Sequence, residues 1–439
     1  MNSPFAFGNH FKAIFKVPNN TFACIDGIRA LGMFCIIIGH TASYSAMMID
    51  FSELQNQVDK TPFWFGWVWN AHYWVDLFFM MSGFLIASLL MVEFEKNNSI
   101  DVTRFYVRRF FRLMPVYFVV VVFFYLVGLP NKENLWWNLL YINNFFDHGQ
   151  TAAPWTWSLA VEEQFYLIFP LLFIYLASNP KKRFQLLTVL FFTSFLVRGL
   201  VLILYPELYK RQLGEVMADH DFQNLYFSVI YDNLYTRFGA FIAGIGGAYL
   251  YMYHREETKR FLNSSTSGTI LIALSLIASF LILASNVQKS QISFPEWFVA
   301  SYYIGARNIL ALSIMTIVLA IMTGNKIVAP IRWILNHKIW YAPAQLTYSA
   351  YLIHLVFVAA ILFNVRANYD ARGGYDYTDP MMLSLTVFLS IVITYSFAAI
   401  LYVFIEKPLI VYRNNLTHQK NFNEEEKTLA PVKARSKNA

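Results

Sequence analysis

Long apolar segments alternate with short polar and charged segments along almost the whole chain. Ten of the apolar segments run for roughly 18 to 26 residues, and a helix needs about 20 residues to cross the hydrocarbon layer of a bilayer. We expect the spans at residues 27–48, 72–92, 113–130, 158–177, 185–205, 235–253, 268–286, 303–323, 344–364 and 380–405. The pattern predicts an all-α fold, a polytopic transmembrane helix bundle of about ten spans.

The composition agrees with a membrane protein and explains the positive charge. Hydrophobic residues make up 57% of the chain and charged residues only 14%, against roughly 25% charged residues in soluble domains. With the N-terminus inside, 23 of the 34 Lys and Arg residues fall in cytoplasmic segments and 7 in external loops. This asymmetry follows the positive-inside rule, so we expect both termini in the cytoplasm. The net charge of +7 then reflects orientation in a membrane, and no nucleic acid partner is expected.

The spans are expected to form one domain between two polar segments. Residues 1–22 are expected to be a cytoplasmic N-terminal segment with a short interfacial helix, and residues 23–413 the transmembrane domain. Residues 414–439 are polar and basic, which predicts a disordered cytoplasmic tail. No cleavable signal peptide is expected, because His40 interrupts the first apolar stretch.

The first span carries a cation and an imidazole. Eleven positions separate Arg29 from His40, which is about three helical turns plus 20°, so both side chains leave the same face about 16 Å apart along the axis. Ionisable residues in so apolar a helix are costly and usually functional. Arg29 is therefore a candidate phosphate anchor, and His40 is a candidate catalytic general base.

Two acids near the starts of other spans are candidate catalytic partners of His40. Asp76, in the second span, either orients His40 or caps its own helix. Glu162 opens the fourth span, and its neighbour Glu163 points to a different face. A carboxylate facing His40 would stabilise the imidazolium that forms during base catalysis. Alternatively, the two glutamates are solvated acids favoured by the dipole at the start of a helix.

An arginine cluster precedes the third span. Helical spacing places Arg104, Arg108 and Arg112 on one face, with Arg109 turned by about 100° from Arg108. Such a cluster can bind phosphate groups through forked, charge-assisted hydrogen bonds. The alternative is a basic loop that only fixes the topology and binds anionic lipids.

Several further polar residues allow two interpretations each. His354, inside an apolar span, is either a satisfied structural residue or a participant in the chemistry. The arginines of the outer leaflet either extend their guanidinium groups to the membrane surface or bind an acidic acceptor; they are Arg198, Arg237 and Arg307. The external segment 206–234 is either a solvated loop or a contact surface for the acceptor.

Six motifs in register resemble those of the integral membrane acyltransferase 3 family. They are the Arg-x10-His run of 26–40, Val75-Asp76-Leu77-Phe78-Phe79 followed by Ser82-Gly83-Phe84-Leu85-Ile86, Arg108-Arg109-x-x-Arg112, Trp157-Ser158-Leu159-x-x-Glu162, Tyr348-Ser349-x-Tyr351-Leu352-x-His354 and Glu406-Lys407-Pro408. The matches cover about 25–408, and Phe79-Met80-Met81-Ser82 departs mildly from the family's usual aliphatic pair. No zinc-type Cys/His cluster or Gly-rich phosphate loop is present in the sequence, and no metal is expected.

The resemblance implies an acyltransferase of the bacterial inner membrane. Its donor would be cytoplasmic acyl-CoA, most often acetyl-CoA, and its acceptor a hydroxyl of a carbohydrate or lipid-linked glycan on the extracytoplasmic side. The family's essential histidine matches His40, its acyl-CoA-binding arginines match Arg29, Arg108 and Arg109, and its active-site glutamate matches Glu162. Many relatives carry a fused C-terminal esterase-like domain, which this chain is expected to lack.

These residues predict a mechanism and leave a rival. The CoA phosphates are expected on Arg108, Arg109 and Arg112 with Arg29 at the channel entrance, while His40 activates the acceptor hydroxyl. Direct transfer is the first interpretation, and an acyl-histidine relay is the second. The rival function is a proton-coupled transporter or flippase of a glycan or lipid; a non-catalytic sensor of acyl-CoA is a third.

Overall fold

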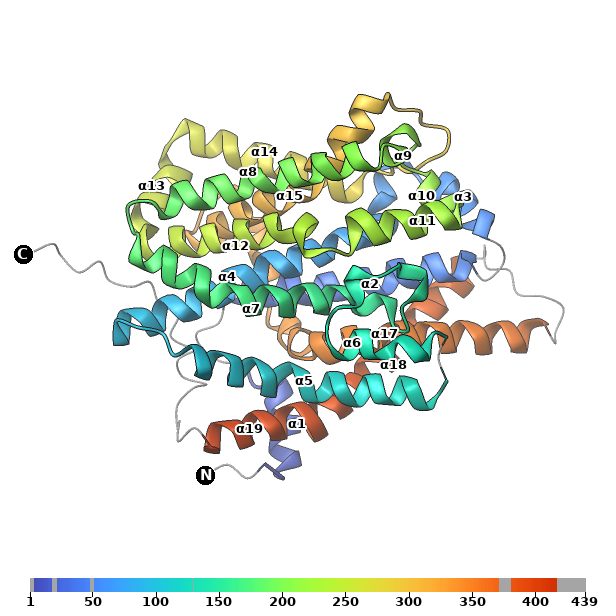
Figure 1. Ribbon diagram of the computed structural model, residues 1–439, viewed down its shortest axis with the longest axis horizontal. Coiled ribbons are helices and arrows are strands. Elements are labelled where there is room, and N and C mark those ends of the chain that lie inside the picture. Colours follow the sequence, from blue (N-terminus) through green and yellow to red (C-terminus); the bar gives the residue numbers. More distant parts are fainter. Residues whose placement is uncertain (1–3, 18–21, 48–50, 129, 371–379, 417–439) are drawn as a thin grey trace, which may run out of the picture.

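The computed structural model describes residues 4–17, 22–47, 51–128, 130–370 and 380–416, and within these ranges the secondary structure is helical (Figure 1). The long helices are α2 (Ala23–Met47), α4 (Trp74–Asn97), α5 (Val102–Leu126), α7 (Trp157–Ser178), α8 (Arg183–Leu204), α12 (Leu234–Tyr253), α14 (Thr266–Ala284), α15 (Glu296–Met322), α17 (Tyr341–Asp370) and α18 (Pro380–Leu401). The shorter α-helices are α1 (Phe7–Phe15), α3 (Phe51–Lys60), α6 (Leu135–Leu139), α9 (Glu207–Lys210), α10 (Glu215–Ala218), α11 (His220–Tyr226), α13 (Arg255–Ser264), α16 (Ala329–Leu335) and α19 (Lys407–Leu416). The 3-10 and π segments are η1 (Phe63–Tyr73), η2 (Lys132–Asn134), η3 (Asn143–Phe145), η4 (His148–Gln150), η5 (Pro154–Thr156), η6 (Phe227–Tyr231), η7 (Lys338–Trp340) and η8 (Tyr402–Glu406).

Each of the ten expected spans falls on a long helix. Within the described ranges, nine helical segments are long and apolar enough to cross a membrane. The one expected span that is not among these nine is α12, whose hydropathy is lowered by Arg237, four tyrosines and four glycines. Helix α12 packs against α4, α8 and α15 inside the bundle. The prediction of a polytopic helix bundle is therefore confirmed, while the cytoplasmic placement of the termini stays a prediction.

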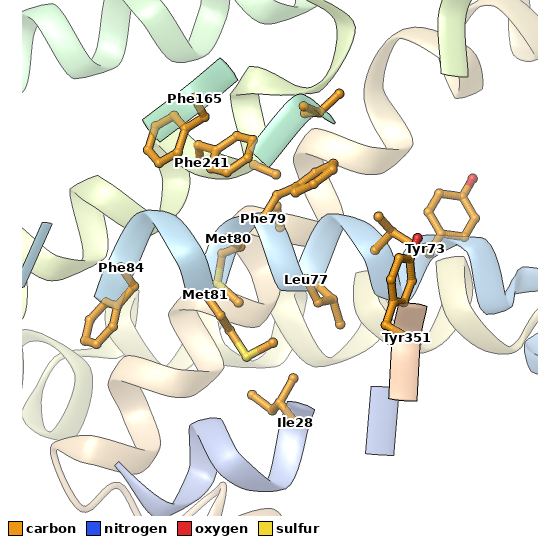
Figure 2. Packing of buried hydrophobic residues seen from close by; sticks show 14 of the residues in the cluster. Ile28, Tyr73, Leu77, Phe79, Met80, Met81, Phe84, Phe165, Phe241 and Tyr351 are labelled. Carbon is orange, nitrogen blue, oxygen red and sulfur yellow. The ribbon is translucent and has the colours of Figure 1, made fainter. Parts of the chain in front are cut away.

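Helix α4 runs through the middle of the bundle and makes its closest contact with α12 (Figure 1). Glycines permit this approach: a Cβ atom on Gly83 would lie 2.4 Å from the carbonyl oxygen of Phe241, and one on Gly244 would lie 2.0 Å from that of Met80. Figure 2 shows the neighbouring aromatic core, in which the Phe241 ring stacks between Phe79 at 4.8 Å and Phe165 at 4.0 Å. Small residues at a crossing of membrane helices allow such close backbone packing.

The Gly244→Ala substitution is expected to destabilise the fold, because the added methyl group would collide with the backbone of α4. Overpacking of this kind typically costs about 1–3 kcal/mol. Gly246→Ala is the matched control, since a Cβ atom at Gly246 meets nothing within 4 Å. Thermal unfolding of the detergent-purified variants should give a lower midpoint for Gly244→Ala alone. Equal midpoints for the two variants would contradict the proposed contact.

Residues Phe7–Phe15 of the N-terminal segment form the amphipathic helix α1, and its interfacial, cytoplasmic placement stays a prediction. In α1, Phe11 and Phe15 are exposed, whereas His10 and Ile14 are buried, and the His10 ring lies 3.3 Å from the carbonyl oxygen of Val403. At the other end α19 continues to Leu416, so its last three residues, 414–416, belong to the expected tail. The rest of the expected tail, 417–439, lies outside the described residues.

Candidate active site

A cavity of about 1150 Å³ lies between helices from both halves of the chain. Its walls come from α1, α2, α4, α5, α7, α17, η8 and α19. The predicted site residues Arg29, Arg108, Arg109, Arg112 and Glu162 all line it. The structure thus brings together the predicted donor-binding arginines and one predicted acid.

One end of the cavity is strongly basic, and we call it the basic end. Seven basic residues line it, from α1 and the residue that follows it, from α5 and from α19: Lys12, Lys16, Arg108, Arg109, Arg112, Lys407 and Arg413. Glu93 of α4 marks the same end, 3.8 Å from Arg108. The Arg413 side chain donates a hydrogen bond to the carbonyl oxygen of Arg108 at 3.2 Å, which joins α19 to α5. Such a concentration of positive charge attracts anionic ligands.

Three of the four arginines of the cluster in α5 line the cavity, and Arg104, near the start of the helix, does not. The Asp101 carboxylate caps the helix by accepting a hydrogen bond from the Arg104 backbone N–H at 2.8 Å, and the Arg104 side chain lies 3.5 Å from that carboxylate. Arg108 and Arg112 follow one and two turns later on the cavity wall. The Arg109 guanidinium lies over the rings of Phe105 and Tyr166, at 5.9 and 5.5 Å.

Two acids that line the cavity accept hydrogen bonds from nearby hydroxyl groups. Glu162 accepts hydrogen bonds from the hydroxyls of Ser82 on α4 and Tyr166 one turn further along α7. Glu406 is buried and accepts a hydrogen bond from the Ser349 hydroxyl at 3.0 Å. The contacts of Glu162 therefore connect two walls of the cavity and include no histidine.

A tyrosine of α17, Tyr351, lines the cavity near Val75, and we call this the deep end. Val75 and Glu93 both line the cavity, and the 18 positions between them correspond to about 27 Å of α4. Tyr351 lines the Val75 end, where its hydroxyl lies 2.5 Å from Ser158 Oγ and 3.2 Å from the carbonyl oxygen of Trp155. The cavity therefore spans most of the thickness of a bilayer.

Two histidines lie one helical turn beyond Tyr351. His40 Nδ1 and His354 Nε2 are 2.9 Å apart, and the two rings are nearly parallel, with planes at 22° and centroids 5.0 Å apart. His354 is fully buried, whereas His40 is partly exposed beside Tyr44. Gly39 allows η1 to approach α2 at this level, since a Cβ atom there would lie 2.4 Å from the Ala71 Cβ. We call His40 and His354 the histidine pair.

The expectation that Asp76 orients His40 is wrong in this structure. The buried Asp76 carboxylate accepts hydrogen bonds from Arg237 at 2.8 and 2.9 Å and from Arg307 at 2.6 Å. It makes no capping hydrogen bond at the start of α4. Its two carboxylate oxygens are thus bound by two guanidinium groups, and the residue that contacts His40 is His354.

The three arginines expected in the outer leaflet do not extend to the surface of the bundle. Arg198, Arg237 and Arg307 are only 1%, 1% and 4% exposed. Arg198 donates hydrogen bonds to the backbone oxygens of Tyr303 at 2.7 Å and Thr236 at 2.9 Å. Of the two interpretations, extension to the membrane surface is wrong, because carbonyl groups and Asp76 inside the bundle replace the water that these side chains would otherwise seek.

Sequence reasoning did not assign four residues that the structure places in or beside the cavity wall: Ser82, Tyr166, His354 and Glu406. The sequence does contain a pattern that indicates His354: the polar residues Tyr348, Tyr351 and His354 follow one another at intervals of three residues on α17. Side chains at this spacing lie near one another on a helix face. A polar stripe on an otherwise apolar span is thus a useful sign of a site.

The fold and the comparisons with known proteins define the class of this chain. It is a multi-pass integral membrane protein by the length and composition of its helices. The family model described as an acyltransferase domain, acyltransferase 3, matches residues 22–403. The chain therefore belongs to the acyltransferase 3 family.

Similar proteins are O-acetyltransferases of bacteria, consistent with a plasma-membrane location. A putative O-acetyltransferase of Staphylococcus aureus strain COL is 25% identical over 88% of this chain and 56% of its own length. The peptidoglycan O-acetyltransferase OatA of Listeria monocytogenes is 32% identical over 36% of this chain and 25% of its own length. O-acetyltransferase OatA of Staphylococcus aureus strain NCTC 8325 is 31% identical over 41% of this chain and 29% of its own length. The matches thus span about half or less of these relatives, and no solved structure matches the chain.

Proposed function

We propose that the protein transfers an acetyl group from cytoplasmic acetyl-CoA to a hydroxyl of a carbohydrate acceptor on the extracytoplasmic side. The observation that carries this proposal is the cavity, which runs from the basic end to Tyr351, next to the histidine pair. A single elongated cavity suits a donor with a charged head and a reactive group on a long arm. The expected charge asymmetry of the loops supports a cytoplasmic position for the basic end.

The basic end would hold the phosphate groups of CoA. Phosphates are strongly hydrated, and the hydrocarbon layer excludes them. Arg108, Arg109 and Arg112 would bind them by charge-assisted hydrogen bonds, with Arg29 further along the cavity. The pantetheine arm would then follow α4 past Ser82 and Glu162, and the thioester would approach the deep end at Tyr351.

His40 would act as the general base of the transfer. Its neutral imidazole takes the proton of the acceptor hydroxyl while the hydroxyl oxygen attacks the thioester carbonyl. The carbon–sulfur bond then breaks, and the thiolate of CoA receives that proton. The contacts of Glu162 support a place in the cavity wall, where it fixes Ser82 and Tyr166 beside the donor. The hydrogen bonds of Asp76 with Arg237 and Arg307 support a structural function for Asp76.

The acceptor is proposed to be a cell-envelope glycan. The name of the Listeria relative includes peptidoglycan, and a polymer of that kind offers hydroxyl groups outside the membrane. His40 is partly exposed beside the exposed Tyr44, which gives an acceptor a route to the imidazole that does not pass through the donor cavity. A lipid-linked glycan fits the same chemistry.

Purified protein in liposomes with radiolabelled acetyl-CoA tests this function. Release of CoA that requires a glycan acceptor, with label on the acceptor, would support the enzyme. Proton-coupled movement of an unmodified solute would support the transporter, and binding of acetyl-CoA without turnover would support the sensor. Label retained on the protein when acceptor is omitted would favour the acyl-histidine relay over direct transfer.

The double substitution Arg108→Ala/Arg109→Ala is expected to raise the KM for acetyl-CoA. Hydrogen bonds to charged groups contribute about 1.5–3 kcal/mol, so the increase should be roughly tenfold to a hundredfold. The substitutions should matter much less for acetyl-dephospho-CoA, which lacks the 3′-phosphate. Steady-state kinetics with both donors measure the difference.

Arg104→Ala is the matched control for this measurement, because Arg104 pairs with Asp101 and is absent from the cavity wall. It should leave the KM for acetyl-CoA within a factor of about three. Equal losses with both donors would mean that Arg108 and Arg109 serve insertion or folding rather than phosphate binding.

A further inference from the structure

The hydrogen bonds of the histidine pair form a chain with a fixed direction. Its first member is the backbone carbonyl of Tyr351, which lies 2.6 Å from His354 Nδ1. Its second link joins His354 Nε2 to His40 Nδ1 at 2.9 Å. Because a carbonyl oxygen can only accept a hydrogen bond, His354 Nδ1 must carry a proton and donate it.

This constraint sets the proton positions of both rings. A neutral imidazole has one donor and one acceptor nitrogen, so the Nε2 of His354 is an acceptor. His40 Nδ1 must then carry the proton that it donates to His354. The remaining nitrogen, Nε2 of His40, keeps its lone pair, and among the described residues it has no hydrogen-bond partner.

We propose that His354 is a positioning residue that holds His40 in the tautomer whose Nε2 lone pair faces the reaction. This inference rests on the proposed acetyl transfer, because it assigns the base function to one nitrogen of His40. A carboxylate orients a catalytic histidine in the same way in other enzymes. Here a neutral, fully buried imidazole would take that place.

This arrangement accounts for each proton that moves during the transfer. The acceptor hydroxyl gives its proton to His40 Nε2 as its oxygen bonds to the acetyl carbon, and the ring becomes an imidazolium. The imidazolium keeps its Nδ1 proton hydrogen-bonded to His354, which stabilises the new charge. When the carbon–sulfur bond breaks, the Nε2 proton passes to the departing thiolate, and the tautomer of His40 is restored.

The tautomer can be measured directly in the unmodified protein. Nitrogen NMR of protein labelled with ¹⁵N-histidine distinguishes a protonated ring nitrogen from one with a lone pair, and comparison with His40→Gln assigns the signals of His40. We expect a protonated Nδ1 and an unprotonated Nε2. A proton on Nε2 of His40 would overturn the inference whatever the activity of the protein.

Two substitutions of similar size test the function of the hydrogen bond. In His354→Gln the amide oxygen can still accept from His40 Nδ1 while its NH₂ group donates to the Tyr351 carbonyl, whereas His354→Leu offers neither group. We expect kcat to fall roughly 10²-fold or more in His354→Leu, on the scale of general base catalysis, and less than about tenfold in His354→Gln. The KM for acetyl-CoA should stay within about threefold in both.

The outcomes separate this inference from the proposed function. Equal kcat losses in the two variants at equal thermal stability, or a large change in KM in both, would assign His354 a merely structural role and overturn the inference. A His354→Leu protein with the wild-type tautomer and kcat would do the same. Absence of acetyl transfer by the wild-type protein would instead refute the proposed function, and the tautomer measurement would still decide the arrangement of the pair.

Discussion

The His40→Gln variant should bind acetyl-CoA normally and transfer almost no acetyl groups. Glutamine preserves much of the shape of the side chain but supplies no base, and general base catalysis typically contributes 10²–10⁴-fold to the rate. The KM for acetyl-CoA should change little, because the arginines proposed to bind the phosphates line the basic end of the cavity, whereas His40 lies beyond Tyr351. Turnover of labelled acetyl-CoA in liposomes, together with the thermal unfolding midpoint, measures both effects.

His254→Gln is the matched control for this variant. His254 is exposed where α12 meets α13, contacts Phe184, and is absent from the cavity wall. It should keep the wild-type kcat. Residual transfer by His40→Gln above about a tenth of the wild-type rate would remove His40 from the mechanism as general base.

Replacement of Asp76 by asparagine is expected to destabilise the whole bundle. The substitution keeps the size of the side chain but removes the negative charge that neutralises two buried guanidinium groups, those of Arg237 and Arg307. Removing one partner from a buried ion pair typically costs 3–5 kcal/mol. The thermal unfolding midpoint and the folded yield after membrane extraction should both fall.

The matched control is Asp101→Asn, which also replaces a carboxylate by an amide. Asp101 caps the exposed start of α5, and asparagine is about as good a helix cap as aspartate. Its unfolding midpoint should therefore stay near that of the wild type. If Asp76→Asn instead folded normally and lost only acetyl transfer, Asp76 would have the catalytic function expected from the sequence.

The helix bundle could be predicted because the signal is local. A run of about 20 apolar residues must satisfy its backbone hydrogen bonds within the membrane, and a helix does so without any partner. The one expected span that falls short of the hydropathy of the others, α12, owes this to Arg237 and to residues that suit contact with α4. Its low hydropathy follows from its position inside the bundle.

The sequence also determined that one face of α2 carries Arg29 and His40, because helical geometry fixes the side-chain directions. It could not determine which helix lies opposite that face. Glu162 and Asp76 were candidate partners of His40, whereas His354 was either a structural residue or a participant in the chemistry. Their separations along the chain do not show which of them lies next to His40 in space.

Only the tertiary structure decided between these partners. Helix α17 packs against α2 and brings His354 to His40, while Asp76 is turned toward arginines of α12 and α15. The physical reason is that hydrophobicity specifies burial without direction, so many helix arrangements satisfy the same apolar pattern. Close contacts at small residues such as Gly39 and Gly244, together with buried polar groups that must find partners, select one arrangement.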